Sequence, residues 1–295
     1  MPGSSNNRMH IPARSPRRPW YLWANLLSLD APLVALAWQD LFARSFHVSL
    51  GPVPRAVTAG CVWLAYTGDR LLDAWRIARE SLVTPRHQFA RRNFLPLTAV
   101  WLAALPMTAY GAFGMLRREL VEGGVILSAL VVGYFVFVHW PGRQRMWPGF
   151  KEGTVAALFC AGTVVFVVAK AGRLPSAAIA PMVFWVALCF LNCLGIGCWE
   201  KDFDLAQRQV SLPLQKPAVE RHYGRLAMSV AGVALAAGLA ERGGDFRALY
   251  FSVATSAFML GGLHHFNFAF EINELRVAAD FVLLTPLLFL PSAGA

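Results

Sequence analysis

Long, almost uncharged apolar blocks constrain this chain more than any other sequence feature. A transmembrane helix needs about 20 consecutive apolar residues, and the blocks have this order of length. We count nine of them, with boundaries good to a few residues: 20–43, 54–74, 94–114, 120–140, 152–170, 177–197, 226–240, 247–267 and 275–292. The pattern predicts an all-α polytopic membrane protein with about nine transmembrane helices.

The charge content argues against a soluble protein. Charged residues make up 15% of the 295 positions, whereas soluble domains carry about 25%. The net charge of +10 would suggest nucleic-acid binding in a soluble protein. Here the basic residues lie between the apolar blocks, where they set membrane topology. We therefore expect a lipid bilayer as partner and no nucleic acid.

The distribution of basic residues predicts the orientation. With a cytoplasmic N-terminus, 19 of the 27 Lys and Arg residues fall on the cytoplasmic side and eight on the other, as the positive-inside rule requires. Residues 1–19 are basic and lack the apolar core of a signal peptide, so we expect a disordered cytoplasmic tail. Residues 20–295 are then a single transmembrane domain in a cell membrane, which we expect to be the bacterial inner membrane.

Two acidic clusters lie in the longest predicted loops, 75–93 and 198–224, or at their borders. Asp69 and Asp73 end the second block, and Glu200, Asp202 and Asp204 follow the sixth. Residues four apart share one face of a helix, so each cluster presents a pair of carboxylates. Both clusters are predicted at the cytoplasmic membrane surface.

Facing carboxylates at a membrane surface suit a divalent metal and a phosphate ligand. Mg²⁺ binds carboxylate oxygens and keeps water and phosphate oxygens as its other ligands. Basic side chains close by would hold the phosphates. The alternative interpretation is structural: Asp69 would pair with Arg70 or Arg76, and Glu200 or Asp204 with Lys201 or Arg208. The matched spacing of the two clusters favours the metal interpretation.

The chain resembles the UbiA-type family of intramembrane prenyltransferases over about residues 24–290. The acids at 200, 202 and 204, with Ser211 seven residues on, are similar to the family's second Asp-rich motif. Leu29-Asp30-Ala31-Pro32 is similar to the family's entry to helix one, and Lys151-Glu152 to the opening of helix five. The first motif departs, because Ala65 and Tyr66 stand where Asn and Asp are expected.

The resemblance implies Mg²⁺-dependent transfer of a prenyl group from a prenyl diphosphate to a hydrophobic aromatic or lipid acceptor, as in quinone biosynthesis. It implies that Asp69, Asp73 and Asp204 are catalytic. The implied metal ligands are Asp69, Asp73, Glu200, Asp202 and Asp204, and the implied diphosphate contacts are Arg70, Arg86, Lys151 and Lys201. The incomplete first motif leaves an alternative: an inactive or repurposed relative that binds isoprenoid lipids.

Other candidates carry weaker signals. Asp280 is an acid inside the ninth block, which makes it a functional candidate or a partner of an interior polar group. His264 and His265 prompt a haem interpretation, but adjacent helical residues point about 100° apart and cannot both face one iron. The five cysteines form no CxxC pair and are expected to be small buried residues. A transporter is disfavoured because no inverted repeat is evident.

Overall fold

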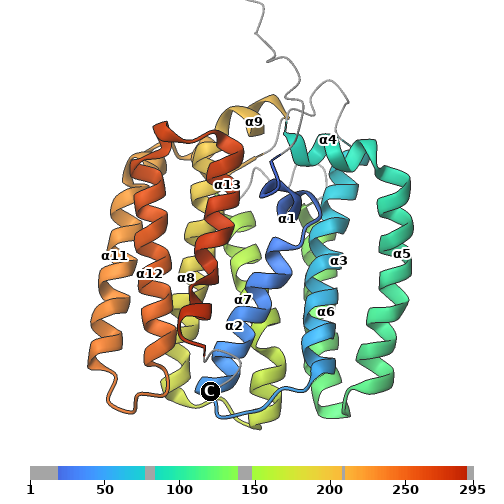
Figure 1. Cartoon of the computed structure of the whole chain (residues 1–295), viewed down its shortest axis with the longest axis vertical. Coiled ribbons are helices and arrows are strands. Elements are labelled where there is room, and N and C mark those ends of the chain that lie inside the picture. Colours follow the sequence, from blue (N-terminus) through green and yellow to red (C-terminus); the bar gives the residue numbers. More distant parts are fainter. Residues whose placement is uncertain (1–18, 77–83, 139–147, 208–209, 291–295) are drawn as a thin grey trace, which may run out of the picture.

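The computed structural model describes residues 19–76, 84–138, 148–207 and 210–290, and these residues form helices and connecting turns with no β-strand (Figure 1). The all-α prediction is therefore confirmed for the described part of the chain. The predicted tail, residues 1–19, lies almost wholly outside it.

An α-helix of at least ten residues lies in each of the nine predicted apolar blocks. In chain order they are α2 (Asp30–Ser45), preceded by the short α1 (Leu22–Leu26), α3 (Pro52–Arg76), α5 (Phe94–Tyr110), α6 (Arg118–Val138), α7 (Phe150–Ala171), α8 (Ser176–Trp199), α11 (Ala218–Ala240), α12 (Arg247–His265) and α13 (Ile272–Phe281). Shorter helices fill the connections: α4 (Pro85–Arg92), α9 (Lys201–Ala206) and α10 (Leu212–Gln215).

Five of these helices are long and apolar enough to cross a membrane, and the chain is an integral membrane protein. They are α5 with its extension to Met115, α6, α7, α8 and α11. The apolar window of α5 has no residue buried by protein, which suits a lipid-facing helix at the edge of the bundle (Figure 1). Membrane crossing by α2, α3, α12 and α13 stays a prediction.

Three of the predicted spans are interrupted. The first is broken between α1 and α2, where Ser28 has a φ of 56°. The third ends in the π-helical turn η2 (Gly111–Met115), and the ninth continues from α13 as the 3₁₀ helix η5 (Val282–Leu288), which contains Pro286. Proline removes a backbone donor and ends regular α-helix, which accounts for the change from α-helix to 3₁₀ helix in the ninth segment.

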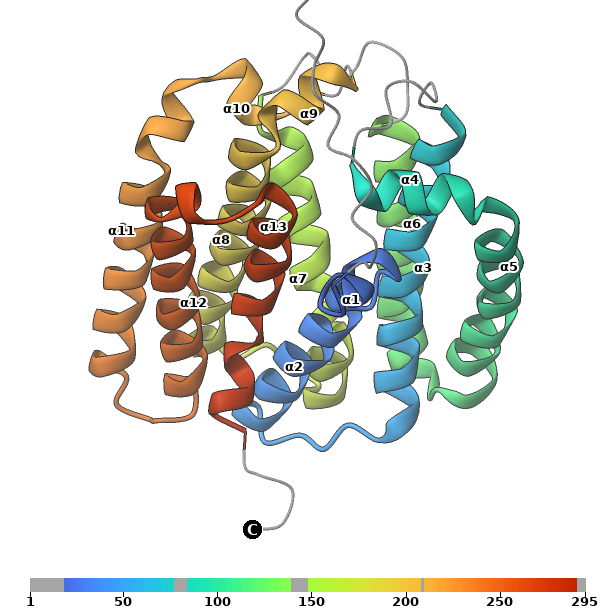
Figure 2. The ribbon, with the colours of Figure 1, turned by 45° about the horizontal axis from the view of Figure 1, so that its top comes forward.

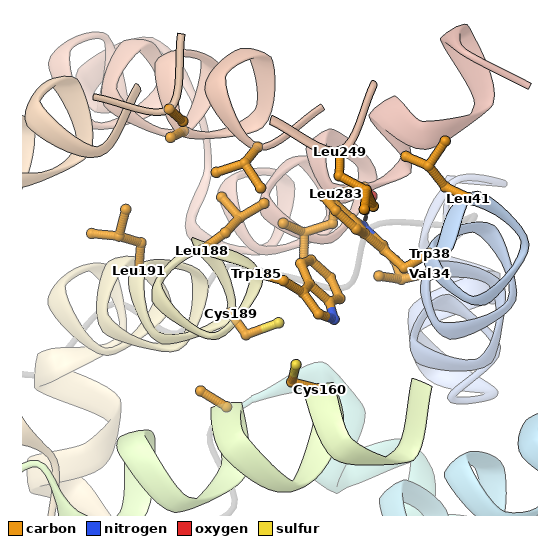
Figure 3. Close-up of a cluster of buried hydrophobic side chains, with 14 of the residues drawn as sticks. Val34, Trp38, Leu41, Cys160, Trp185, Leu188, Cys189, Leu191, Leu249 and Leu283 are labelled. Carbon is orange, nitrogen blue, oxygen red and sulfur yellow. Dashed lines mark hydrogen bonds between the residues drawn. The ribbon is translucent and has the colours of Figure 1, made fainter. Parts of the chain in front are cut away.

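Two stacked tryptophans mark the centre of the bundle. The rings of Trp38 on α2 and Trp185 on α8 are stacked with centroids 3.8 Å apart, and both side chains are fully buried (Figure 3). Trp38 Nε1 donates to the Leu283 carbonyl at 2.8 Å, and Trp185 Nε1 donates to Thr163 Oγ1 at 3.1 Å. Both indole donors are thus satisfied in an apolar interior, as buried tryptophans require.

The three short helices α4, α9 and α10 lie at one end of the bundle, where α3 and α8 end (Figures 1 and 2). These helices belong to the two long loops that separate the predicted spans. The predicted meeting of the two loops at one end is therefore confirmed, and this end carries the acidic clusters.

Candidate functional site

Glu200 joins the two loops. Its Oε2 lies 3.1 Å from Arg86 Nη2 on α4 and 2.7 Å from Arg276 Nη1 on α13, and its side chain is 6% exposed. Burial raises the pKa of Glu200, and the Arg86 guanidinium opposes that rise. The structure therefore places Glu200 in a buried pair with two arginines, a form of the predicted ion-pair alternative with different partners.

His87 connects α4 to Asp73 of the first acidic cluster and to the residue that follows α9. Its Nε2 lies 3.4 Å from Asp73 Oδ2 on α3. On the other side of the ring, Nδ1 lies 2.8 Å from Thr84 Oγ1 and 3.2 Å from Gln207 Nε2. Desolvation lowers the pKa of His87. The buried imidazole thus links the two loops through Asp73 and Gln207.

Asp204 on α9 faces a mixed set of polar groups. Burial raises the pKa of Asp204, while the Ser211 hydroxyl, Lys151 and Arg86 lower it. Lys151 and Ser211 also line a small pocket between α6, α7 and α10, together with Glu152. Lys151 is exposed at this end of the bundle.

Glu152 positions the segment that follows the second cluster. It is buried, and its Oε1 accepts a hydrogen bond from the Leu212 backbone N–H at 2.7 Å. This contact fixes the start of α10, and it places Ser211 beside Asp204. Lys151 therefore lies on the side of Asp204, whereas Glu152 fixes the segment that carries Ser211.

The other predicted site residues lie around this group. Asp69 is half-buried on α3 and Asp202 is exposed on α9. Arg70 is buried and donates to the carbonyls of Asn25 and Leu26, so it holds α1. Lys201 Nζ lies 3.1 Å from Glu220 Oε2, which ties α9 to α11. Contact of Arg70 or Lys201 with diphosphate stays a prediction.

As arranged, the acids do not form a metal site by themselves. Among the described residues, no three His, Cys, Asp or Glu side chains lie close enough together to hold a metal ion. Glu200 faces two arginines, and Asp73 faces His87. A Mg²⁺ ion that arrives with diphosphate needs fewer protein ligands, because phosphate oxygens and water supply the rest. The donor set suits that substrate complex better than a resident metal.

Several residues at this end were not predicted from the sequence. In the sequence, Arg276 was only one of the 19 basic residues that predict the membrane orientation, and His87 and Gln207 belong to no recognisable motif. A signal for Arg276 exists, because it lies one helical turn before Asp280 and both are ionisable groups in an apolar segment, which are rarely without partners.

Comparison with known proteins identifies the fold. No protein-family profile and no curated protein matches the sequence. A UbiA homologue from Archaeoglobus fulgidus, solved with DMAPP and Mg²⁺, is similar with a TM-score of 0.56 at 13% identity, over 90% of this chain and 98% of that one. An apo UbiA homologue from Aeropyrum pernix K1 gives 0.57 at 14%, over 89% and 98%. The resemblance to the UbiA-type family is thus confirmed for the fold, and the roles of individual residues stay predictions.

Proposed function

We propose that this protein transfers a prenyl group from a prenyl diphosphate to a hydrophobic acceptor inside the membrane. The observation that carries the proposal is the meeting of both loops at one end of a UbiA-type bundle, where Arg86, Lys151 and Asp204 lie together. The similar archaeal homologue was solved with DMAPP, a prenyl diphosphate, and with Mg²⁺. The polar end would take the diphosphate, and the apolar interior would take the prenyl chain.

The first chemical step is loss of diphosphate. Cationic Lys151 and Arg86 would stabilise the negative charge that develops on the leaving oxygen. Mg²⁺ bound to the diphosphate would neutralise more of that charge. The electron pair of the breaking C1–O bond leaves with the diphosphate and an allylic cation remains.

Aromatic rings lie next to the place where that cation would form. Tyr66, one turn before Arg70 on α3, makes an edge-on contact with Phe159 on α7 at 6.2 Å between centroids. Both side chains are only partly buried. Aromatic faces attract cations, so these rings would stabilise the intermediate until the acceptor attacks C1.

Donor binding and turnover test the proposal. The purified protein in nanodiscs would be given labelled geranyl, farnesyl or geranylgeranyl diphosphate, with Mg²⁺ or chelator and a membrane lipid extract as acceptor source. We expect Mg²⁺-stimulated donor binding and formation of a prenylated product. Lys151→Ala and Asp204→Asn should each weaken binding or turnover about 10-fold or more, the loss of one charge-assisted contact. Lys216→Ala, an exposed lysine at the same end, is the matched control.

A second candidate function is binding of isoprenoid lipid without transfer. It is favoured by Ala65 and Tyr66 in the first motif and by the engagement of Glu200 with two arginines. Mg²⁺-dependent donor binding without any product from the extract would support this alternative. Absence of donor binding would contradict both functions.

A further inference from the structure

A second polar cluster lies deeper in the bundle, away from the loop end. It is formed by Asn25 on α1, Asp30 on α2, Asn192 on α8 and Asp280 on α13. Asn25 Nδ2 donates to Asp30 Oδ2 at 2.7 Å and lies 3.4 Å from Asp280 Oδ2. Asn192 Nδ2 donates to Asp280 Oδ1 at 3.2 Å. Helices from the beginning, middle and end of the chain therefore meet at two carboxyl groups.

The two carboxyl groups lie beside one shared donor. Asn25 Nδ2 reaches an oxygen of Asp30 and an oxygen of Asp280. The buried Arg70 guanidinium lies near both acids. A carboxylate in such a position can take a proton from a hydroxyl group bound next to it.

Asn192 supplies an unused hydrogen-bond acceptor at the same place. Its side chain is 8% exposed, and its Oδ1 has no hydrogen-bond partner among the described residues. The same amide donates to Asp280, so Oδ1 lies at the cluster. Leaving a buried carbonyl unpartnered costs about 1–3 kcal/mol. A ligand hydroxyl would satisfy it.

The cluster lies at a defined depth below the loop end. Asp280 and Tyr66 are half-buried. Asn192 precedes Glu200 by eight residues, which is about 12 Å at a rise of 1.5 Å per residue. An acceptor head at the cluster would therefore lie about that far from a diphosphate head at the loop end.

We propose that this cluster binds the hydroxyl group of a neutral, hydroxyl-bearing acceptor and takes its proton during transfer. The inference rests on the proposed prenyl transfer. The donor C1–O bond breaks with its electron pair on diphosphate, C1 bonds to the acceptor oxygen, and the hydroxyl proton moves to a carboxylate of the cluster. That carboxyl group then releases the proton to water. A carboxylate-bearing acceptor is rejected, because it would place a further negative charge beside the two acids.

Acceptor binding without donor tests the site independently of transfer. The probe is 4-nonylphenol, titrated into protein in nanodiscs and corrected for empty nanodiscs. We expect Asn192→Leu to weaken binding about 10-fold, and 4-nonylbenzoate to bind at least about 10-fold more weakly than the phenol. The matched control is Gln39→Leu, which removes another fully buried amide whose Oε1 has no described partner, nine residues beyond Asp30 on α2. Equal phenol affinity in wild type and Asn192→Leu overturns the proposal.

Turnover with the phenol then tests the proton-accepting role. We expect Asp280→Asn to keep donor binding within about twofold while the yield of prenyl ether falls at least about 10-fold. An unchanged ether yield overturns this role. If the phenol binds as expected but no donor binds to wild type, the transferase function fails and the hydroxyl site stands. If the donor turns over but Asn192→Leu leaves the phenol affinity unchanged, the hydroxyl site fails and the transferase function stands.

Discussion

At the scale of single residues, the most consequential contact is the one that Glu200 makes with Arg86 and Arg276. A buried carboxylate between two guanidinium groups is costly to form and more costly to break, because removal of one partner leaves charges uncompensated. The three residues come from three separate segments, at positions 86, 200 and 276. Their contact therefore joins α4, the end of α8 and α13 at the loop end of the bundle.

We expect Glu200→Gln to destabilise the protein by about 3–5 kcal/mol, since it leaves two partly buried arginines without their carboxylate partner. The comparison variant is Glu220→Gln, which breaks the half-exposed pair with Lys201 and should cost no more than about 1 kcal/mol. Thermal unfolding in detergent measures both. If Glu200 acts instead as a metal ligand, its loss would reduce Mg²⁺-dependent donor binding and leave the unfolding temperature unchanged.

His87 makes the docking of α4 sensitive to pH. Its pKa in the folded protein is lowered from 6.5 by desolvation, so an undocked α4 takes up a proton first as the pH falls. Docking is therefore most stable above about pH 6.5 and weakens below it, down to the folded-state pKa. We expect the α4 amides to exchange faster at pH 5.5 than at pH 7.5, after correction for intrinsic rates.

The variant His87→Gln separates the contribution of His87 from that of the acids close by, because a glutamine side chain does not titrate between pH 5.5 and 7.5. Glu200 and Asp204 keep their own titrations in both proteins. If the pH dependence of α4 exchange is the same in the variant and the wild type, His87 is not its cause.

At the scale of elements, close approach of α8 and α11 depends on one glycine. A Cβ at Gly195 would lie 2.5 Å from Tyr223 Oη, whereas a Cβ at Gly197 would meet Pro213 at 3.4 Å. Tyr223 is fully buried and donates to the Leu191 carbonyl at 3.1 Å. The ring therefore cannot move aside without losing both packing and a hydrogen bond.

We expect Gly195→Ala to destabilise the α8–α11 contact by about 1–3 kcal/mol, the usual cost of overpacking a core. Gly197→Ala should be tolerated, because 3.4 Å is ordinary van der Waals contact. Thermal unfolding of the two variants, side by side, measures the difference. Equal stability of the two would show that Tyr223 relaxes freely and that the close approach is not limiting.

At the scale of the whole molecule, the bundle has two unlike ends. The loop end carries α4, α9 and α10 with the charged site, and the opposite end carries short turns such as the one at Gly243 (Figure 2). The excess of basic residues in the segments of the loop end predicts that it faces the cytoplasm. The diphosphate donor would then enter from the cytoplasmic side.

Thiol labelling across the membrane tests this orientation. Cysteines introduced by Lys216→Cys at the loop end and Gly243→Cys at the other end both occupy exposed positions. We expect a membrane-impermeant maleimide to label the first in inside-out vesicles and the second in right-side-out vesicles. Wild type, whose five cysteines include the exposed Cys61, gives the background. The reverse labelling pattern would contradict the cytoplasmic placement of the site.

The sequence by itself determined the class of fold and the neighbourhood of the site. Apolar block length is a local property, so the helices fall where hydropathy predicts them. The paired acids of each cluster lie one helical turn apart within a single segment, and the count of predicted spans puts the two loops that bear them on the same side of the membrane. These features need no knowledge of which helix packs against which.

Only the tertiary structure decided which polar groups meet. Arg276 reaches Glu200 across 76 residues, and Asp280 reaches Asn25 across 255. Such contacts depend on helix order, rotation and depth, which periodicity within one helix does not encode. For this reason the sequence located the carboxylates. Packing determined that Glu200 lies between two arginines, and that Asp280 meets Asn192 deeper in the bundle.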